Sequence, residues 1–313
     1  MRLPRTLAVL TSALGLMCAT TATATAAELT PVTDFGANPG ALAMHSYVPD
    51  GLPAGAPLVV ALHGCTQNAD DYFTHSGWRE HADRFGFAVV LAEQPAANNA
   101  RQCFNWFEPA DSDRDSGEAA SIRQMVAYAH DTYGTDSGRT FVTGLSAGGG
   151  MTANLLADYP DVFAGGAVNA GPPAKCATTL PAALSCMSSD QGKTPQQWGD
   201  LVRGSHPGHT GAWPRVAIWQ GTADTTVAPV NATELRDQWT DVHGLPQTPT
   251  GSEQLPGGTT RTSYSDQVVE FSVDGMGHGL AVDPDAGCGV AGTYYLDTIC
   301  STHHTAVLWG LAE

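Results

Sequence analysis

The chain has 313 residues, of which 31 are acidic and 14 are Lys or Arg, so its formal net charge at pH 7 is -17. A surface of this sign repels nucleic acid and anionic membranes, and we expect neither as a partner. The length suffices for one large α/β domain, and nothing in the sequence resembles a linker or a repeat. We therefore expect a single domain after any targeting segment, acting as a monomer.

The first 27 residues have the pattern of a secretory signal peptide. Arg2 and Arg5 precede an uncharged run over residues 6–27 that ends in small residues, and the most apolar part of that run is too short to span a bilayer comfortably. We expect residues 1–27 to be a signal peptide and residues 28–313 to be the domain of a secreted, extracellular protein. Without the two arginines, 12 basic residues face 31 acidic ones, a net charge of -19.

Short apolar runs alternate with helical patterns along the rest of the chain. The expected strands cover residues 41–48, 57–62, 87–91, 141–143, 165–169, 216–219 and 268–273. The expected helices cover residues 77–85, 151–159, 230–243 and 302–311, and a further one opens on a capping box of Asp115 and Glu118 and stops at Gly134. Residues 94–115 and 171–213 are expected to be long loops. This alternation predicts a mostly parallel sheet with helices on both faces, with its chemistry at the carboxyl ends of the strands.

Cysteine usage agrees with export. Apart from Cys18 in the signal segment the chain has six cysteines, and an even number in a secreted chain indicates disulfides. No two form a C-x-x-C pair and none lies beside a His cluster with ligand-like spacing, so no metal site is expected. Six cysteines permit many connectivities. Our hypothesis pairs nearest neighbours: Cys65 with Cys103, Cys176 with Cys186, and Cys288 with Cys300.

Ser146 lies at the centre of a Gly-x-Ser-x-Gly motif, residues 144–148, between an expected strand and an expected helix. This context suits a nucleophile elbow, in which glycines allow a sharp turn that presents the serine hydroxyl above the sheet. The motif alone is weak, because glycine and serine also combine in ordinary loops. The residues around the motif decide whether Ser146 is a nucleophile.

A serine hydroxyl needs a base, and the base needs an acid that fixes its tautomer. Asp224 and His278 follow expected strands in the order Ser, Asp, His, which is the order of α/β-hydrolases. Asp224 could equally be a turn aspartate, and Asp274 and Asp283 compete for the role of the acid. We predict Ser146, Asp224 and His278 as a catalytic triad.

The loop after the expected strand at residues 57–62 begins His63-Gly64-Cys65. In this architecture that loop and the residue after the nucleophile supply backbone N–H groups to an oxyanion hole. We therefore expect the N–H groups of Cys65 and Ala147 to hold the oxyanion, and His63 to brace the loop. A Cys65–Cys103 disulfide would tie this loop to the segment around Trp106.

Three ordered motifs resemble the secreted polyhydroxybutyrate depolymerase family: LHGCTQ at residues 62–67, CFNWF at 103–107 and GLSAGG at 144–149. The tail at residues 288–311 shares the likeness, which runs from about residue 40 to the end. The same esterase group includes feruloyl and acetylxylan esterases.

The resemblance implies an α/β-hydrolase fold and a metal-independent serine esterase that needs no cofactor and cleaves a carboxylic ester through an acyl-enzyme. It assigns the same triad and oxyanion donors, and it adds Trp106 as a candidate wall of the substrate cleft, with core packing as an equal alternative. Many feruloyl esterase relatives carry Trp-Pro after the catalytic histidine, whereas this chain has Gly279-Leu280. Together with the Cys-Gly-x-Ala-Gly-x-Tyr pattern at residues 288–294, this favours the polyester branch.

Three other functions stay open. A feruloyl or acetylxylan esterase would act on plant cell-wall esters. An acyltransferase of the same fold would pass the acyl group to a sugar instead of water. A non-catalytic binding protein on a hydrolase scaffold would have an inert Ser146, which the complete triad argues against. Relatives that attack solid polymer usually carry a linker and a separate binding domain as well.

Overall fold

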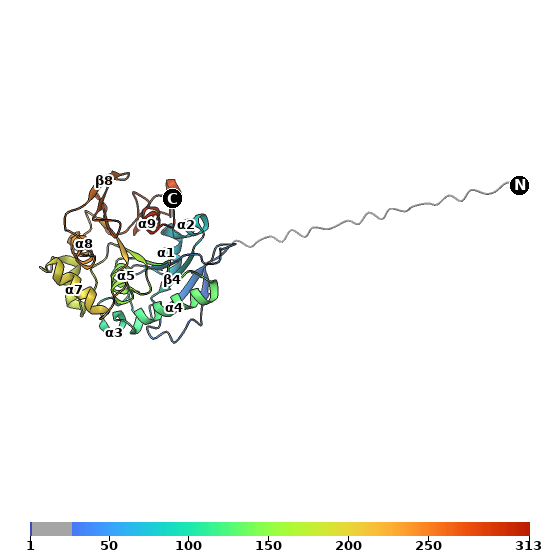
Figure 1. Cartoon of the computed structure of the whole chain (residues 1–313), viewed down its shortest axis with the longest axis horizontal. Helices are drawn as coiled ribbons and strands as arrows, with labels where there is room; N and C mark the ends of the chain where they lie inside the picture. Colours follow the sequence, from blue (N-terminus) through green and yellow to red (C-terminus); the bar gives the residue numbers. More distant parts are fainter. Residues whose placement is uncertain (2–26) are drawn as a thin grey trace.

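The computed structural model describes Met1 and residues 27–313 (Figure 1). The predicted signal peptide, residues 1–27, therefore falls almost wholly outside the described residues. Over the range that is described, no helix has both the length and the apolar character needed to cross a membrane.

A ten-stranded sheet forms the centre of the fold, in the order β1-β2-β4-β3-β5-β6-β7-β10-β9-β8. The six strands from β4 to β10 in this order are parallel to one another, and antiparallel pairs complete both ends. The predicted mostly parallel sheet is confirmed. In chain order the strands are β1 (Thr30–Val32), β2 (Ala43–Tyr47), β3 (Leu58–Leu62), β4 (Ala88–Glu93), β5 (Thr140–Leu145), β6 (Gly165–Asn169), β7 (Arg215–Gly221), β8 (Gly251–Leu255), β9 (Thr259–Ser263) and β10 (Val268–Val273), with a separate pair of β11 (Leu280–Val282) and β12 (Tyr295–Asp297).

Helices cover both faces of this sheet, because each parallel connection crosses over one face. They are α1 (Ala69–His75), α2 (Trp78–Phe85), α3 (Pro109–Ser112), α4 (Gly117–Tyr133), α5 (Ala147–Asp158), α6 (Leu180–Ser188), α7 (Pro195–Ser205), α8 (Val230–Val242), the 3-10 turn η1 (Pro284–Ala286) and α9 (Ser301–Trp309). Helices α4, α5, α7 and α8 contribute to one core, and α1, α2 and α9 to the other. Figure 1 shows α9 beside α2 at one side of the molecule.

The side chains of strand β3 alternate between two hydrophobic cores, one on each face of the sheet. Leu58, Val60 and Leu62 face the core that contains α4 and α5, whereas Val59 and Ala61 face the core that contains α2 and α9. Because successive side chains of a strand point to opposite faces, a strand buried on both sides is a continuous apolar run. Each fully buried Val or Leu stabilises the fold by about 1.5–3 kcal/mol.

The C-terminal helix closes the second core with stacked aromatic rings. The ring of Trp309 in α9 lies 5.5 Å from that of Trp78 in α2 and 4.8 Å from that of Phe141 in β5, both nearly parallel. Stacked aromatic pairs stabilise the fold beyond the contribution of their buried apolar area. The expected closing helix is therefore present, one residue earlier at its start than its predicted range.

Several elements were not expected from the sequence. The excursion at residues 171–213, predicted as a loop, contains α6 and α7. Their N-caps are Thr179 and Thr194, whose side chains accept hydrogen bonds from the first turn of each helix. Threonine followed by proline within two residues is a helix-start signal, and the abundance of Pro, Ser and Gly concealed it. Helices α1 and α3, strand β1, the β8–β9 hairpin and the β11–β12 pair were also missed.

The predicted capping box of Asp115 and Glu118 is wrong. Helix α4 has Ser116 as its N-cap, without a side-chain hydrogen bond, and Asp115 has a positive φ of 61° outside the helix. Glu118 is fully buried. Glu118 matched the capping pattern because it lies three residues after Asp115. Its side chain, however, lies in the interior of the protein.

Three disulfides join the described cysteines: Cys65–Cys103, Cys176–Cys186 and Cys288–Cys300. These are the pairs expected from the sequence. The first links the segment after β3 to the segment before α3, the second joins the segment before α6 to the C-terminal part of that helix, and the third holds the start of α9 against the segment after η1.

Candidate active site

Ser146 is the single residue between β5 and α5, with φ 57° and ψ -115°. A non-glycine residue in this conformation is strained, and such strain is typical of a nucleophile elbow. The two flanking glycines are sterically required. A Cβ on Gly144 would lie 2.2 Å from the carbonyl oxygen of Gly148, and one on Gly148 would lie 2.5 Å from that of Leu62. Helix α5 consequently begins at Ala147, directly after the serine and four residues before its predicted start.

Asp224 and His278 lie in the loops that follow β7 and β10, which are neighbouring parallel strands. The Asp224 Oδ2 and His278 Nδ1 atoms are 2.7 Å apart. Asp224 is 3% exposed, and its Oδ1 accepts hydrogen bonds from the backbone N–H groups of Thr226 and Val227 at 2.8 and 2.9 Å. Since the carboxylate is fixed and accepts the Nδ1 proton, Nε2 of a neutral His278 is left free to act as a base.

The two competing aspartates are engaged elsewhere. Asp274 accepts a hydrogen bond from the Thr222 hydroxyl at 3.2 Å, and Asp283 accepts one from the Ala286 backbone N–H at 3.0 Å as the N-cap of η1. Neither is bonded to His278 within the described chain. Of the three candidates for the acid, the structure brings only Asp224 to the histidine.

Ser146 and His278 line one cavity of about 380 Å³ at the carboxyl ends of the strands. Cys65, Ala147 and Trp106 line it as well. All residues predicted for the triad, the oxyanion hole and the cleft wall, except the buried Asp224, therefore line this cavity, and Asp224 contacts the cavity residue His278.

The backbone N–H groups of Cys65 and Ala147 have no hydrogen-bond partner among residues 27–313. In a segment where most backbone groups are paired, two free donors beside the serine hydroxyl are available to a developing negative charge. The adjacent Gly64 N–H is bonded to Gln67 Oε1 at 2.6 Å, and the Cys65–Cys103 disulfide restrains the same turn. The loop is thus fixed before any substrate binds.

His63 braces this loop. Its Nδ1 donates to the carbonyl oxygen of Gly64 at 2.7 Å, and its Nε2 accepts a hydrogen bond from the Gln94 N–H at 3.0 Å. Burial lowers the pKa of His63, which keeps the ring neutral and preserves both bonds. The expected bracing role agrees with these contacts.

Glu118 connects the brace to the Trp106 segment and was not recognised from the sequence. One carboxyl oxygen accepts a hydrogen bond from the Asn105 backbone N–H at 2.9 Å, and the other accepts one from the Gln94 side-chain amide. The Gln94 N–H is in turn the donor to His63. A chain of hydrogen bonds therefore runs from the oxyanion loop to the residue that precedes Trp106.

Trp106 is buried in the core and also lines the cavity. It is 4% exposed and packs against Gly150 in α5, where an added Cβ would lie 2.9 Å from the indole ring. Its carbonyl oxygen accepts a hydrogen bond from the Asn154 amide at 2.6 Å. The same residue lines the cavity. It is a core residue with one side on the cleft.

Burial raises the pKa of Glu118 to about 8, although the two hydrogen bonds that it accepts act in the opposite direction. The folded chain therefore binds this proton more tightly than the unfolded chain, where the ordinary value is 4.5. The contribution to stability is greatest below the unfolded pKa and is lost as the pH rises through about 8. We expect the free energy of unfolding of the wild type to fall relative to that of Glu118→Gln between about pH 5 and about pH 9.

Urea denaturation at a series of pH values measures this difference. Glu108→Gln, at an exposed position, is the matched control and should follow the wild type. Parallel pH curves for the wild type and Glu118→Gln would show that the buried carboxyl does not titrate as stated.

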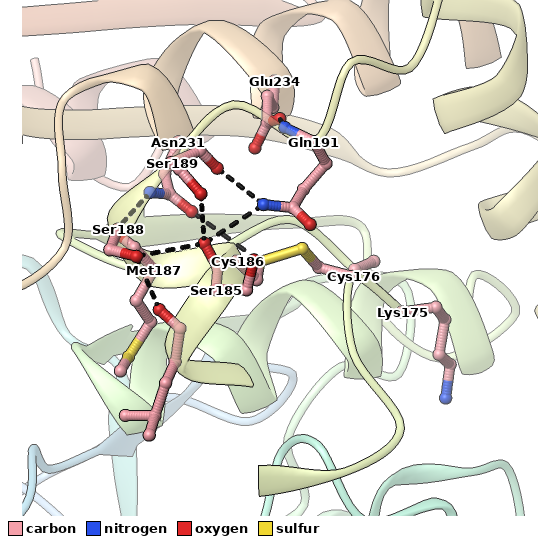
Figure 2. Close-up of a disulfide and its surroundings, with 12 residues drawn as sticks. Lys175, Cys176, Ser185, Cys186, Met187, Ser188, Ser189, Gln191, Asn231 and Glu234 are labelled. Atoms are coloured by element: carbon pink, nitrogen blue, oxygen red, sulfur yellow. Dashed lines mark hydrogen bonds between the residues drawn. A yellow bond between two sulfur atoms is a disulfide. The ribbon is translucent and has the colours of Figure 1, made fainter. Parts of the chain in front are cut away.

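Helix α6 forms an apolar wall of the cavity through Leu180, Leu184 and Met187. Figure 2 shows how its C-terminal end is held: the Cys176–Cys186 disulfide joins it to the preceding segment, and Asn231 of α8 donates to the Met187 carbonyl oxygen at 3.0 Å. Leu180 and Leu184 are more than half exposed. The wall is thus anchored at its C-terminal end and exposed to solvent at Leu180 and Leu184.

Removing this disulfide tests whether it positions the wall. The Cys176→Ser/Cys186→Ser variant opens a loop with a sequence separation of 10, which should lower the free energy of unfolding by about 2–3 kcal/mol. We also expect a higher KM for a 3-hydroxybutyrate trimer, while the KM for the smaller p-nitrophenyl acetate changes less. Equal changes in both KM values would contradict a role for α6 in binding the longer substrate.

Within the described residues, only one group of three His, Cys, Asp or Glu side chains has the proximity of a metal site, namely His81, Cys288 and Cys300. Its two sulfur atoms are joined to each other in a disulfide. They are therefore not thiolates, which are the form of cysteine that binds metals.

Known proteins similar to this chain are ester hydrolases. The family model described as Esterase PHB depolymerase matches residues 42–263. The chain is 47% identical over 291 residues to poly(3-hydroxyalkanoate) depolymerase C of Paucimonas lemoignei, covering 90% of this chain and 70% of that protein. It is 38% identical to an acetylxylan esterase of Coprinopsis cinerea, with 85% and 72% covered, and 35% identical to feruloyl esterase B of Talaromyces stipitatus, with 82% and 74% covered.

Among solved structures, the acetyl xylan esterase from Aspergillus awamori superimposes with a TM-score of 0.78 at 29% identity, over 91% of this chain and 100% of that one. An S-formylglutathione hydrolase from Agrobacterium tumefaciens, at 15% identity and a TM-score of 0.52 over 82% of this chain and 91% of that one, shares the fold. The predicted α/β-hydrolase fold is confirmed. The family model and the identities together show that the chain belongs to the Esterase PHB depolymerase family of carboxylic ester hydrolases.

Proposed function

We propose that this ester hydrolase works as a serine esterase through an acyl-enzyme on Ser146. The observation that carries the proposal is the 2.7 Å contact between the buried Asp224 and His278, whose ring lines the same cavity as the strained Ser146. A hydroxyl, an oriented imidazole and two free N–H groups meet the chemical needs of acyl transfer.

In the first half of the reaction, His278 Nε2 takes the proton of the Ser146 hydroxyl as the oxygen attacks the ester carbonyl. The N–H groups of Cys65 and Ala147 stabilise the oxyanion, and Asp224 stabilises the imidazolium. His278 then gives the proton to the departing alcohol. In the second half, His278 removes a proton from water, which attacks the acyl carbonyl. His278 then returns the proton to the Ser146 oxygen as the acid leaves.

The substrate proposed first is a short-chain 3-hydroxyalkanoate ester, in oligomeric or polymeric form. The relative from Paucimonas lemoignei, which is 47% identical to this chain, is a poly(3-hydroxyalkanoate) depolymerase. The apolar wall of α6 fits the short alkyl side groups of such an ester. Three disulfides suit an oxidising compartment, which supports action outside the cell.

A second candidate is an acetylated or feruloylated plant polysaccharide, since the acetylxylan and feruloyl esterases are also relatives. A panel of 3-hydroxybutyrate trimer, acetylated xylan and methyl ferulate separates the candidates by kcat/KM. We expect the trimer to give the highest value. A higher value for acetylated xylan or methyl ferulate would move the assignment to plant cell-wall esters, and product analysis with a sugar acceptor would reveal acyl transfer in place of hydrolysis.

A further inference from the structure

A second cavity of about 240 Å³ adjoins the first. Thr66, Gln67 and Tyr294 line both, so the two spaces share a boundary. The ring of Tyr294 also lies 6.3 Å from the ring of His278. The volume corresponds to about eight water molecules at about 30 Å³ each, which is room for one small substrate unit. A group bound there would be next to the scissile ester.

The second cavity is lined by polar side chains from α1 and from the segment before β12. Asp71 and His75, one helical turn apart in α1, lie on the same face, and Thr293 lies opposite in the chain segment that precedes β12. The first cavity, by contrast, takes its wall from Leu180, Leu184 and Met187. The two compartments therefore suit different parts of one substrate.

Several polar atoms in the lining of this second cavity make no hydrogen bond within the described residues. The Asp71 carboxylate and the side-chain nitrogen of Gln67 make no hydrogen bond within residues 27–313, although Gln67 Oε1 is held by the Gly64 N–H. His75 Nδ1 donates to the Val290 carbonyl oxygen at 2.7 Å, so Nε2 of the neutral ring is an acceptor. Two acceptors and one donor match a group that both donates and accepts, which is the property of a hydroxyl.

Other ligand classes fit less well. A carboxylate would meet the charge of Asp71 in a protein that is already strongly acidic. A metal ion would find only Asp71 and His75, and no third ligand joins them in the part of the chain that is described. Because an uncharged hydroxyl avoids both problems, it is the ligand that this lining favours.

We propose that this second cavity binds a hydroxyl-bearing unit of the substrate next to the scissile ester, with Asp71 as its main acceptor. The proposal rests on the proposed esterase function. The hydroxyl has two possible sources, a sugar that carries the acyl group or the hydroxyl-terminal unit of a 3-hydroxyalkanoate oligomer.

Kinetics of Asp71→Asn test the proposal. For each source, a hydroxylated substrate is compared with a reference that lacks the hydroxyl: acetylated xylotriose with p-nitrophenyl acetate, and the 3-hydroxybutyrate trimer with its terminally O-methylated form. The quantity measured is the ratio of the two kcat/KM values. Loss of a hydrogen bond to a charged acceptor should lower this ratio about tenfold in at least one pair. Asp70→Asn, an exposed neighbour in the same helical turn that does not line the cavity, should leave both ratios unchanged.

If the kcat/KM ratio falls only for acetylated xylotriose against p-nitrophenyl acetate, the ligand is a sugar. If the ratio falls only for the 3-hydroxybutyrate trimer against its O-methylated form, the ligand is the hydroxyl terminus of the oligomer. Ratios within about twofold of the wild type in both pairs, or an equal fall in Asp70→Asn, would overturn the proposal. The esterase function is tested separately by whether p-nitrophenyl acetate hydrolysis depends on Ser146, so the two failures are distinguishable.

Discussion

Replacing Ser146 by alanine is expected to lower kcat for ester hydrolysis by about 10⁴-fold or more, because the hydroxyl that forms the acyl-enzyme is removed. Alanine removes only the hydroxyl, and the backbone of the turn, with its φ of 57°, is set by the packing of Gly144 and Gly148. The melting temperature should therefore stay close to that of the wild type. Initial rates with p-nitrophenyl acetate and a thermal melt measure the two effects.

Ser252→Ala, on the exposed strand β8, is the matched control and should retain full activity. Turnover by Ser146→Ala at the wild-type rate would refute the assignment of Ser146 as the nucleophile. A loss of activity accompanied by a large fall in melting temperature would point to a structural role for the hydroxyl.

The second large effect concerns the tautomer of His278. Asp224→Asn would present an amide to Nδ1, and an amide N–H favours the tautomer with its proton on Nε2. That tautomer cannot accept the serine proton, so kcat should fall by about 10⁴-fold. The Thr226 and Val227 N–H groups can still bind the remaining oxygen of the amide, which limits the structural damage.

Asp274→Asn and Asp283→Asn serve as controls, because their carboxylates bond to Thr222 and to the N-terminus of η1 and not to His278. Both variants should keep kcat within a few-fold of the wild type. If Asp283→Asn lost activity while Asp224→Asn retained it, the acid of the triad would be misassigned.

The sequence predicts the central fold because its signals are local and strong. Strands β3 to β7 and β10 are buried on both faces, so they appear as short apolar runs, and their alternation with helices leaves a parallel sheet as the natural arrangement. The order of Ser146, Asp224 and His278, each after a strand, then places all three at one edge. Their meeting depends only on topology, which the alternation provides.

The features that were not predicted from the sequence have a different origin. Glu118 matched a capping pattern, yet its partners Gln94 and Asn105 are 24 and 13 residues away, and no local signal indicates such contacts. The second cavity depends on α1 meeting the segment before β12, where Asp71 and Thr293 are more than two hundred residues apart. Contacts between distant segments require the packed structure, whereas the capping signals of α6 and α7 were present in the sequence and were overlooked.

Two of the three disulfides restrain segments that line the cavity at Ser146. Cys65–Cys103 restrains the oxyanion loop and the Trp106 segment, and Cys176–Cys186 restrains the α6 wall. Both adjoin the cleft. They reduce the freedom of the groups that must be in place when the ester binds, which is the geometry that catalysis by fixed hydrogen-bond donors requires.

Trapping of the acyl-enzyme tests the central claim most directly. During turnover of p-nitrophenyl acetate, the reaction is quenched in acid and the peptides are analysed by mass spectrometry. The account predicts an acetyl group in ester linkage on Ser146, together with a burst of p-nitrophenol equivalent to one site per chain if deacylation is the slower step. Turnover with the acetyl group on another residue, or a burst of p-nitrophenol that leaves Ser146 unmodified, would contradict it.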